Sequence, residues 1–149
     1  MKKHLKKSML ILLACMMLHV MSLPVSATSG NEQIAPCYIN ANSYTDEFII
    51  TDSGIAVVMV TYKGLPSAFT KADITVKIQK KFLFLFWNDV DIGYPNNEWT
   101  DECTDLNGTF YNTFAVNGTG TYRALITVNI YGHTSGYDTI ELIREYKYQ

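Results

Sequence analysis

The residues of this chain that could do chemistry are few and far apart. After residues 1–27 the chain has a single histidine, His133, which lies in a turn beside Gly132. A Ser-His-Asp or Cys-His site would need this one imidazole to meet a nucleophile from elsewhere in the fold. No serine has the flanking glycines of a nucleophile elbow. We therefore predict that the protein is not an enzyme and uses no cofactor.

Oxygen-bearing side chains gather in one polar stretch, which holds Asp89, Asp91, Glu98, Asp101, Glu102, Asp105 and Asn107. Carboxylates at this density are typical Ca²⁺ ligands, but their spacing does not match an EF-hand loop. One histidine and two distant cysteines also make a poor zinc site. We predict a solvated acidic loop here and no bound metal.

The third feature is an uninterrupted apolar run, Phe82-Leu83-Phe84-Leu85-Phe86-Trp87, which follows Lys80 and Lys81. Alternate side chains of a strand point to opposite faces, so both faces of this run are apolar. We favour a strand end buried by a neighbouring loop, because short apolar runs usually belong to a core. The alternative is an exposed hairpin tip that binds a partner or a membrane surface, with these six residues as the site.

The elements that would position these residues follow an N-terminal segment typical of export. Four lysines lie at positions 2–7, an apolar run covers 9–23, and Val25-Ser26-Ala27 supplies the small residues of a cleavage site. The apolar run is too short for a comfortable membrane span. We predict that residues 1–27 are a cleaved signal peptide and that residues 28–149 form one secreted, extracellular domain.

Two alternatives to cleavage after Ala27 stay open. Leu12-Leu13-Ala14-Cys15 is similar to a lipoprotein signal, in which Cys15 would carry a lipid anchor. Cleavage before Cys15 would leave only the six residues 9–14 as the apolar core, which argues against it. An uncleaved membrane anchor is disfavoured because the apolar run has the usual length of a signal peptide.

Cleavage would make the protein distinctly acidic. Residues 1–27 hold four of the 12 basic residues and none of the 14 acidic ones, so their removal changes the net charge from −2 to −6. Nucleic-acid phosphates repel such a protein, and we exclude nucleic acid as a partner. All 10 Tyr, 7 Phe and 2 Trp stay in the mature chain, and this composition favours strands.

Two cysteines remain after cleavage, Cys37 and Cys103. In an exported protein they could form a disulfide that closes a loop of about 65 residues and contributes about 3 to 4 kcal/mol. Two free thiols are the alternative, because the geometry of a disulfide is strict and the spacing does not give the distance in the fold.

The mature chain alternates between β-rich runs and turns, without an apolar stripe of helical period. Strands are predicted at 34–39, 43–50, 55–62, 73–81, 87–92, 109–116, 121–131 and 137–146, with a polar, turn-rich segment at 93–108. The predicted inward residues are Ala56, Val58, Val60, Ile74, Val76, Ile78, Tyr122, Ala124, Ile126, Val128 and Ile130. Seven or eight short strands predict an all-β, immunoglobulin-like, two-layer antiparallel β-sandwich.

A local pattern supports this fold class. Gly120-Thr121-Tyr122-Arg123 is typical of a tyrosine corner, in which the hydroxyl of a Tyr near the start of a strand bonds back to the preceding turn. An antibody domain would have a Cys two residues later, where this chain has Ala124. The inter-sheet disulfide of antibody domains is therefore not expected at this point.

The order of features resembles an uncharacterised group of small secreted β-sandwich proteins from Gram-positive, Firmicutes-type bacteria. The residues that carry the resemblance are Ile34-Ala35-Pro36 with Tyr38, Ser53-Gly54-Ile55-Ala56, the segment 74–81, Trp87 with Val90, and Gly120-Thr121-Tyr122-Arg123. The resemblance implies the fold and export, and it brings no activity or binding residues. The chain departs from the group at 82–86, where members usually carry small polar residues.

From these features we expect a secreted, non-enzymatic domain that binds an extracellular protein, a glycan or a cell-envelope component. The alternative is a small secreted toxin or bacteriocin-like effector, in which residues 82–87 act on a membrane surface. The two differ in what the apolar run must do, since an effector of this kind needs it exposed.

Overall fold

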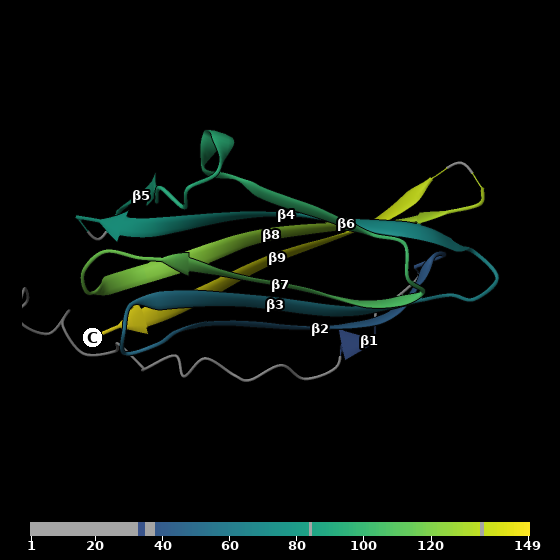
Figure 1. The fold of residues 1–149 in the computed structure, drawn as a ribbon, viewed down its shortest axis with the longest axis horizontal. Coiled ribbons are helices and arrows are strands. Elements are labelled where there is room, and N and C mark those ends of the chain that lie inside the picture. The colour runs from purple at the N-terminus through teal and green to yellow at the C-terminus, as the bar shows by residue number, and fades with distance from the viewer. Residues whose placement is uncertain (1–32, 35–37, 84, 135) are drawn as a thin grey trace, which may run out of the picture.

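The computed structural model describes residues 33–34, 38–83, 85–134 and 136–149. These residues form nine antiparallel strands and one short 3-10 helix, and the strands make two sheets that face each other (Figure 1). The prediction of an all-β, two-layer sandwich is confirmed.

The first sheet, sheet A, has the strand order β1-β2-β3-β7. Its members are β1 (Gln33–Ile34), β2 (Ala41–Ile50), β3 (Ile55–Gly64) and β7 (Asn107–Ala115). β2 and β3 are joined by a tight turn in which Gly54 has a φ of +75°, a conformation that L-residues with side chains avoid.

The second sheet, sheet B, is built around β4 and β8. Its members are β4 (Phe69–Phe82), β5 (Phe86–Asp89), β6 (Trp99–Cys103), β8 (Gly120–Gly132) and β9 (Tyr137–Tyr148), with the 3-10 helix η2 (Pro95–Asn97) between β5 and β6. β8 pairs along one edge of β4, while β6 and β5 pair in succession along the other edge. β9 closes the far side of the sheet by pairing with β8.

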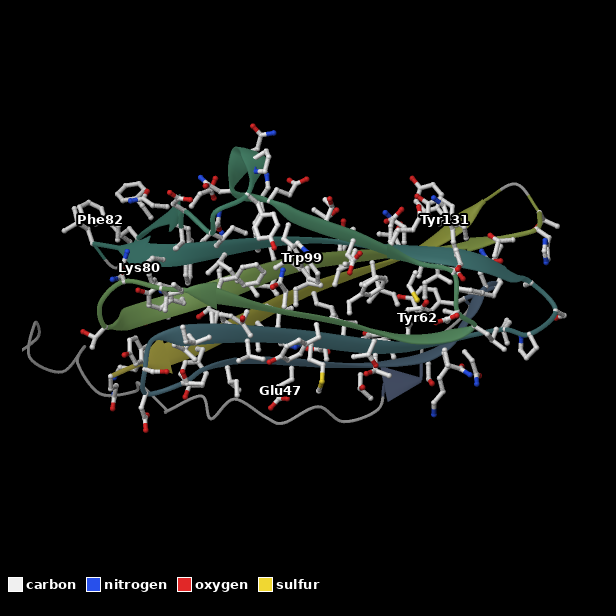
Figure 2. All side chains as sticks on the ribbon, viewed as in Figure 1. Glu47, Tyr62, Lys80, Phe82, Trp99 and Tyr131 are labelled. Atoms are coloured by element: carbon white, nitrogen blue, oxygen red, sulfur yellow. The ribbon has the colours of Figure 1, made fainter. Side chains whose placement is uncertain are left out.

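The core lies between the sheets and follows the two-residue period of the strands. The predicted inward residues of β3, β4 and β8 are all buried, with exposed fractions of 0 to 1%. Large rings fill the space between them, including Tyr62, Phe110 and Phe114, and Figure 2 shows Trp99 and Tyr62 between the layers. The alternation in the sequence therefore located the buried faces correctly.

Polar contacts join the sheets on the side where β2 lies beside β9. The Nε and Nη2 atoms of Arg144 donate to the Oδ2 and Oδ1 atoms of Asp46 at 2.5 and 2.8 Å. At the other end of β9, the buried carboxylate of Asp138 accepts hydrogen bonds from the backbone N–H groups of Ile39, Asn40 and Ala41. These bonds satisfy donors that would otherwise be buried without partners.

Several predicted boundaries are wrong, among them that of the strand predicted at 87–92, which ends at Asp89. The segment 93–108 contains β6, whose Trp99 packs into the core although its neighbours are polar and exposed, so it lacks an apolar pattern. β4 begins at Phe69, before the predicted start at Asp73. At the N-terminus β1 holds two residues, residues 35–37 of the predicted strand lie outside the described residues, and Tyr38 and Ile39 are not in a strand.

Candidate functional site: an exposed apolar hairpin

The described residues of the apolar run, 82–83 and 85–87, lie at the end of β4, in the turn after it and at the start of β5. Gln79 pairs with Asp89, Lys80 with Asn88, Lys81 with Trp87, and Phe82 with Phe86. The backbone N–H of Leu85 donates to the carbonyl of Phe82 at 3.2 Å and tightens the turn. We call residues 82–87 the apolar tip.

The apolar tip is exposed. The exposed fractions are 54% for Phe82, 65% for Leu83, 77% for Leu85 and 61% for Phe86. Trp87 is half-buried, and Phe84 lies outside the described residues. The favoured prediction, that a neighbouring loop buries this run, is therefore wrong for the tip residues that the structure describes.

The length of β4 explains the exposure. β4 has 14 residues, and its last fully buried member is Ile78. The hairpin extends beyond the turn that joins β2 and β3 (Figure 1), so no strand of sheet A faces the tip. Figure 2 places Phe82 at this end of the molecule, with Lys80 close to it. Side chains that would be core in the middle of the sandwich are therefore in contact with water here.

The outward side of the hairpin base is a stack of cationic and aromatic groups. The guanidinium carbon of Arg123 lies 4.2 Å from the centre of the Trp87 ring, and the Lys81 ammonium lies 5.4 Å from it. Arg123 Nε donates to Gln79 Oε1 at 2.8 Å, and Gln79 Nε2 donates to Asp89 Oδ1 at 2.7 Å. These contacts connect Trp87 at the base of the hairpin to β4 and β8.

The inward side of the base is fixed by the turn before β8. The Lys80 ammonium donates to the carbonyl of Asn117 at 2.7 Å and lies 5.1 Å from the centre of the Tyr122 ring. The Tyr122 hydroxyl lies 2.6 Å from the carbonyls of both Asn117 and Gly118. The predicted tyrosine corner is therefore confirmed. Its turn also binds the hairpin, because Lys80 and Tyr122 donate to the same carbonyl, that of Asn117.

Sequence reasoning missed Arg123 and Asn117 as parts of this site. Arg123 was an outward residue of a predicted strand, and Asn117 a turn residue. Their contacts with Trp87 and Lys80 follow from the register of β4 against β8 and β5. No local signal in the sequence gives that register between distant segments.

Leu83, in the apolar tip, has an unusual backbone conformation. Its φ is +46°, in the left-handed region where Gly and Asn are the common residues. A leucine there costs about 1 to 2 kcal/mol. The chain thus keeps an exposed apolar side chain at a position where a small polar residue would be easier to accommodate.

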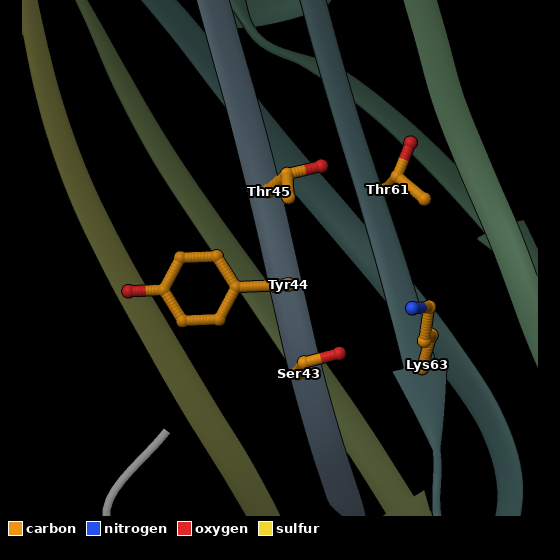
Figure 3. A pocket seen from close by; sticks show the side chains of 5 residues that line it. All are labelled: Ser43, Tyr44, Thr45, Thr61 and Lys63. Atoms are coloured by element: carbon orange, nitrogen blue, oxygen red, sulfur yellow. The ribbon is translucent and has the colours of Figure 1, made fainter. Parts of the chain in front are cut away.

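Two hollows in the described surface are shallow and open to solvent. One, of about 340 Å³, lies beside the tip and is lined by Lys80, Lys81, Phe82, Asn88, Asp89, Val90, Asn117 and Tyr122. The other, of about 190 Å³, lies on β2 and β3 and is lined by the five residues of Figure 3. In the second hollow the Thr61 hydroxyl is bonded to that of Thr109. Neither has the enclosed, apolar lining of a small-molecule site.

The remaining sequence features are placed apart from the tip. His133 is exposed at the far end of β8 from the tip. The residues of the polar stretch are spread over β5, β6, the start of β7 and the segments between them. Glu98 pairs with Lys77 at 3.0 Å and Glu102 with Lys71 at 2.5 Å. In the described residues no three His, Cys, Asp or Glu side chains are grouped as metal ligands.

Cys103 is half-buried at the end of β6. Its sulfur is near the buried Tyr62, whose hydroxyl donates to the carbonyl of Asp105 at 2.8 Å. Burial, with a contribution from Cys103, raises the pKa of Tyr62 well above its usual value. Cys37 lies outside the described residues, so a disulfide between Cys37 and Cys103 stays a prediction.

The described part of the chain has no helix with the length and apolarity needed to traverse a lipid bilayer. The chain matches no known family model, no curated protein and no solved structure. The class of protein is therefore defined by the fold and the site alone, as a two-layer antiparallel β-sandwich with an exposed apolar hairpin at one end.

Proposed function

We propose that this protein is a secreted, non-enzymatic binding domain whose contact surface is the apolar tip. Its partner in this proposal is an extracellular protein, a glycan or a component of the cell envelope. The observation that carries the proposal is the exposure of four large apolar side chains, Phe82, Leu83, Leu85 and Phe86, on one short turn. Contiguous apolar surface of this kind on a folded domain marks an interaction site.

The strand order supports an immunoglobulin-like classification of the sandwich. In one sheet β2, β3 and β7 are neighbours, and in the other β4, β8 and β9 follow each other, with β5 and β6 at the β4 edge. This arrangement corresponds to strands A, B and E facing C, F and G of the immunoglobulin fold. Tyr122, near the start of the strand that corresponds to F, has the tyrosine-corner contact of such domains.

Export, and a relation to the secreted Gram-positive group, belong to the same proposal. Their support is the order of charged, apolar and small residues in 1–27 and the residues that carry the resemblance. Release of a mature chain that begins at Thr28 is checked by mass spectrometry of the secreted product. A mature N-terminus at a lipid-modified Cys15 would support the anchored alternative.

A second candidate, a secreted toxin or bacteriocin-like effector, is favoured by the same exposure of the tip. An effector that permeabilises membranes would release a dye trapped inside lipid vesicles. A binding domain would leave the dye inside. Dye release therefore separates the two functions without knowledge of a natural partner.

The proposal is tested with a double substitution, Leu85→Ser with Phe86→Ser, in the chain 28–149, which contains all nine strands. Both side chains are exposed, so the variant is expected to fold like the wild type. Ile143→Ser on β9 is the matched control, since Ile143 is 58% exposed. We expect binding to isolated Gram-positive cell envelopes to be lost in the tip variant and kept in the control. Equal binding by all three proteins would contradict the proposal.

A further inference from the structure

We propose that the partner of the apolar tip is the surface of an anionic lipid bilayer, into which the hairpin docks peripherally. This inference rests on the proposed function, because it names the partner of the same site. It is carried by the chemical order of side chains along the hairpin, by the position of the charges relative to the tip, and by the shape of the tip.

The side chains of the hairpin change with distance from the turn, from apolar to a level that holds an amphipathic and a cationic residue. Leu83 and Leu85 are in the turn, and the pair Phe82 and Phe86 comes next. Trp87 pairs with Lys81 one position further down. This order matches a bilayer surface, where hydrocarbon is followed by the interfacial region that Trp prefers and that holds the lipid phosphates.

On β4, β5, β8 and β9 the basic groups lie nearer the tip than the acidic groups, whereas Asp52, in the turn between β2 and β3, is an acidic residue at the same end of the sandwich. Lys81 and Lys80 are the first two charged residues below Phe82 on β4. Lys147 on β9 is level with Thr121, next to Tyr122, the β8 partner of Lys80. The acidic residues of these strands, Asp89 and Glu145, are level with Gln79 and Arg123, further from the tip.

The lysines near the tip give this end of the molecule a different charge from the rest of the protein, which is acidic. The mature chain has a net charge of −6, so an anionic membrane repels most of its surface. A tip that presents lysines first is attracted to the membrane and sets one orientation. Asp89 also accepts a hydrogen bond from Gln79, its partner on β4.

The shape of the tip favours lipid over a protein partner. The apolar side chains belong to one protruding turn, and the neighbouring hollow of about 340 Å³ is a shallow, open depression whose lining includes the charged residues Lys80, Lys81 and Asp89. Stable protein interfaces bury about 1,200 to 2,000 Å² in all, and one turn offers only a small part of this. A fluid lipid surface can enclose a protruding turn without a complementary groove.

The depth of docking follows from the length of the apolar segment. A membrane-spanning strand needs about 9 to 11 residues, whereas the apolar tip has six. Lys81 immediately precedes Phe82 on β4, is exposed, and would remain at the phosphates. The hairpin therefore enters the interface and does not cross the bilayer.

The test is vesicle co-sedimentation of the chain 28–149, with vesicles of phosphatidylcholine alone and of phosphatidylcholine mixed with phosphatidylglycerol. We expect binding to the anionic vesicles that weakens as salt is raised, with a blue shift of tryptophan emission. Leu85→Ser with Phe86→Ser should weaken this binding by more than about tenfold. Lys81→Gln should weaken it by about fivefold, and Ile143→Ser should leave it unchanged.

A second arm separates this inference from the proposed function. The same four proteins are bound to cell envelopes before and after detergent extraction of the lipids. Tip-dependent binding to extracted envelopes, with no binding to vesicles, would overturn the lipid inference and leave the proposed function standing. Vesicle binding that the tip variant retains would also overturn the inference. Absence of tip-dependent binding to either material would overturn both.

Discussion

The guanidinium carbon of Arg123 lies 4.2 Å from the centre of the Trp87 ring and so connects the apolar hairpin to the central strand β8. Arg123 also donates to Gln79, which in turn donates to Asp89. The hairpin is thus held at its base by β8 although its tip has no partner strand. This arrangement lets an exposed apolar turn keep one orientation, because the groups that fix it lie on the rigid sheet.

Removing the Arg123 cation should loosen the hairpin base. We expect Arg123→Gln to lower the free energy of unfolding by about 0.5 to 1 kcal/mol, measured by urea denaturation. In a Trp87→Leu background the same substitution should cost clearly less, because the ring partner is gone. An equal cost in both backgrounds would show that Arg123 does not act through Trp87.

We expect Leu83 to lower the stability of the fold through its backbone conformation and to strengthen binding to lipid vesicles. Leu83→Asn should raise the free energy of unfolding by up to about 1 kcal/mol, because Asn tolerates the observed φ of +46° better than Leu. The same variant should bind vesicles more weakly. Thermal denaturation and co-sedimentation on one preparation check both effects, and a loss of stability would refute the strain argument.

The tyrosine corner should contribute measurable stability. Tyr122→Phe removes the hydroxyl that contacts the carbonyls of Asn117 and Gly118 at 2.6 Å. We expect a loss of about 1 to 1.5 kcal/mol in the free energy of unfolding. Tyr111→Phe is the control, since Tyr111 is 59% exposed and its substitution should change stability very little.

Asp138 should be among the most sensitive positions on β9. Its carboxylate accepts from the backbone N–H groups of Ile39, Asn40 and Ala41, at 3.2, 2.6 and 3.1 Å. Asp138→Ala would leave these donors without a partner, and we expect a cost of about 3 kcal/mol or more. Glu141→Ala, at an exposed position of the same strand, should cost less than about 0.5 kcal/mol. Urea denaturation of both variants makes the comparison.

Alkaline pH should destabilise the fold through Tyr62. Burial raises the pKa of its hydroxyl above the ordinary value of 10.0, so above pH 10 the folded state holds a proton that the unfolded state has lost. The stabilisation present below pH 10 is then lost as the pH rises further. Tyr62→Phe should reduce this alkaline loss, and Tyr44, whose pKa burial also raises, should account for part of the remainder. Urea denaturation from neutral pH to about pH 11 tests this, and an unchanged alkaline slope in Tyr62→Phe would exclude Tyr62 as the main source.

The sequence by itself determined the fold class and the buried faces. The alternation of apolar and polar residues in 55–62, 73–81 and 121–131 correctly predicted which side chains are buried. Alternate side chains of a strand point to opposite faces of the sheet, so every second residue lies on the same face. The Gly120-Thr121-Tyr122-Arg123 pattern also identified the tyrosine corner correctly, since that contact is local. Both the two-residue period and a contact between neighbouring residues can be recognised without knowing how distant segments pair.

Only the tertiary structure decided whether residues 82–87 are core or surface. An apolar run has the same pattern in both environments, and its burial depends on where the opposite sheet ends. The inclusion of Trp99 in a strand and the contact of Arg123 with Trp87 likewise depend on pairing between distant segments. Register of this kind is set by the packing of the whole sandwich. The exposure of the apolar tip and its contacts with β8 therefore could not be predicted from the sequence alone.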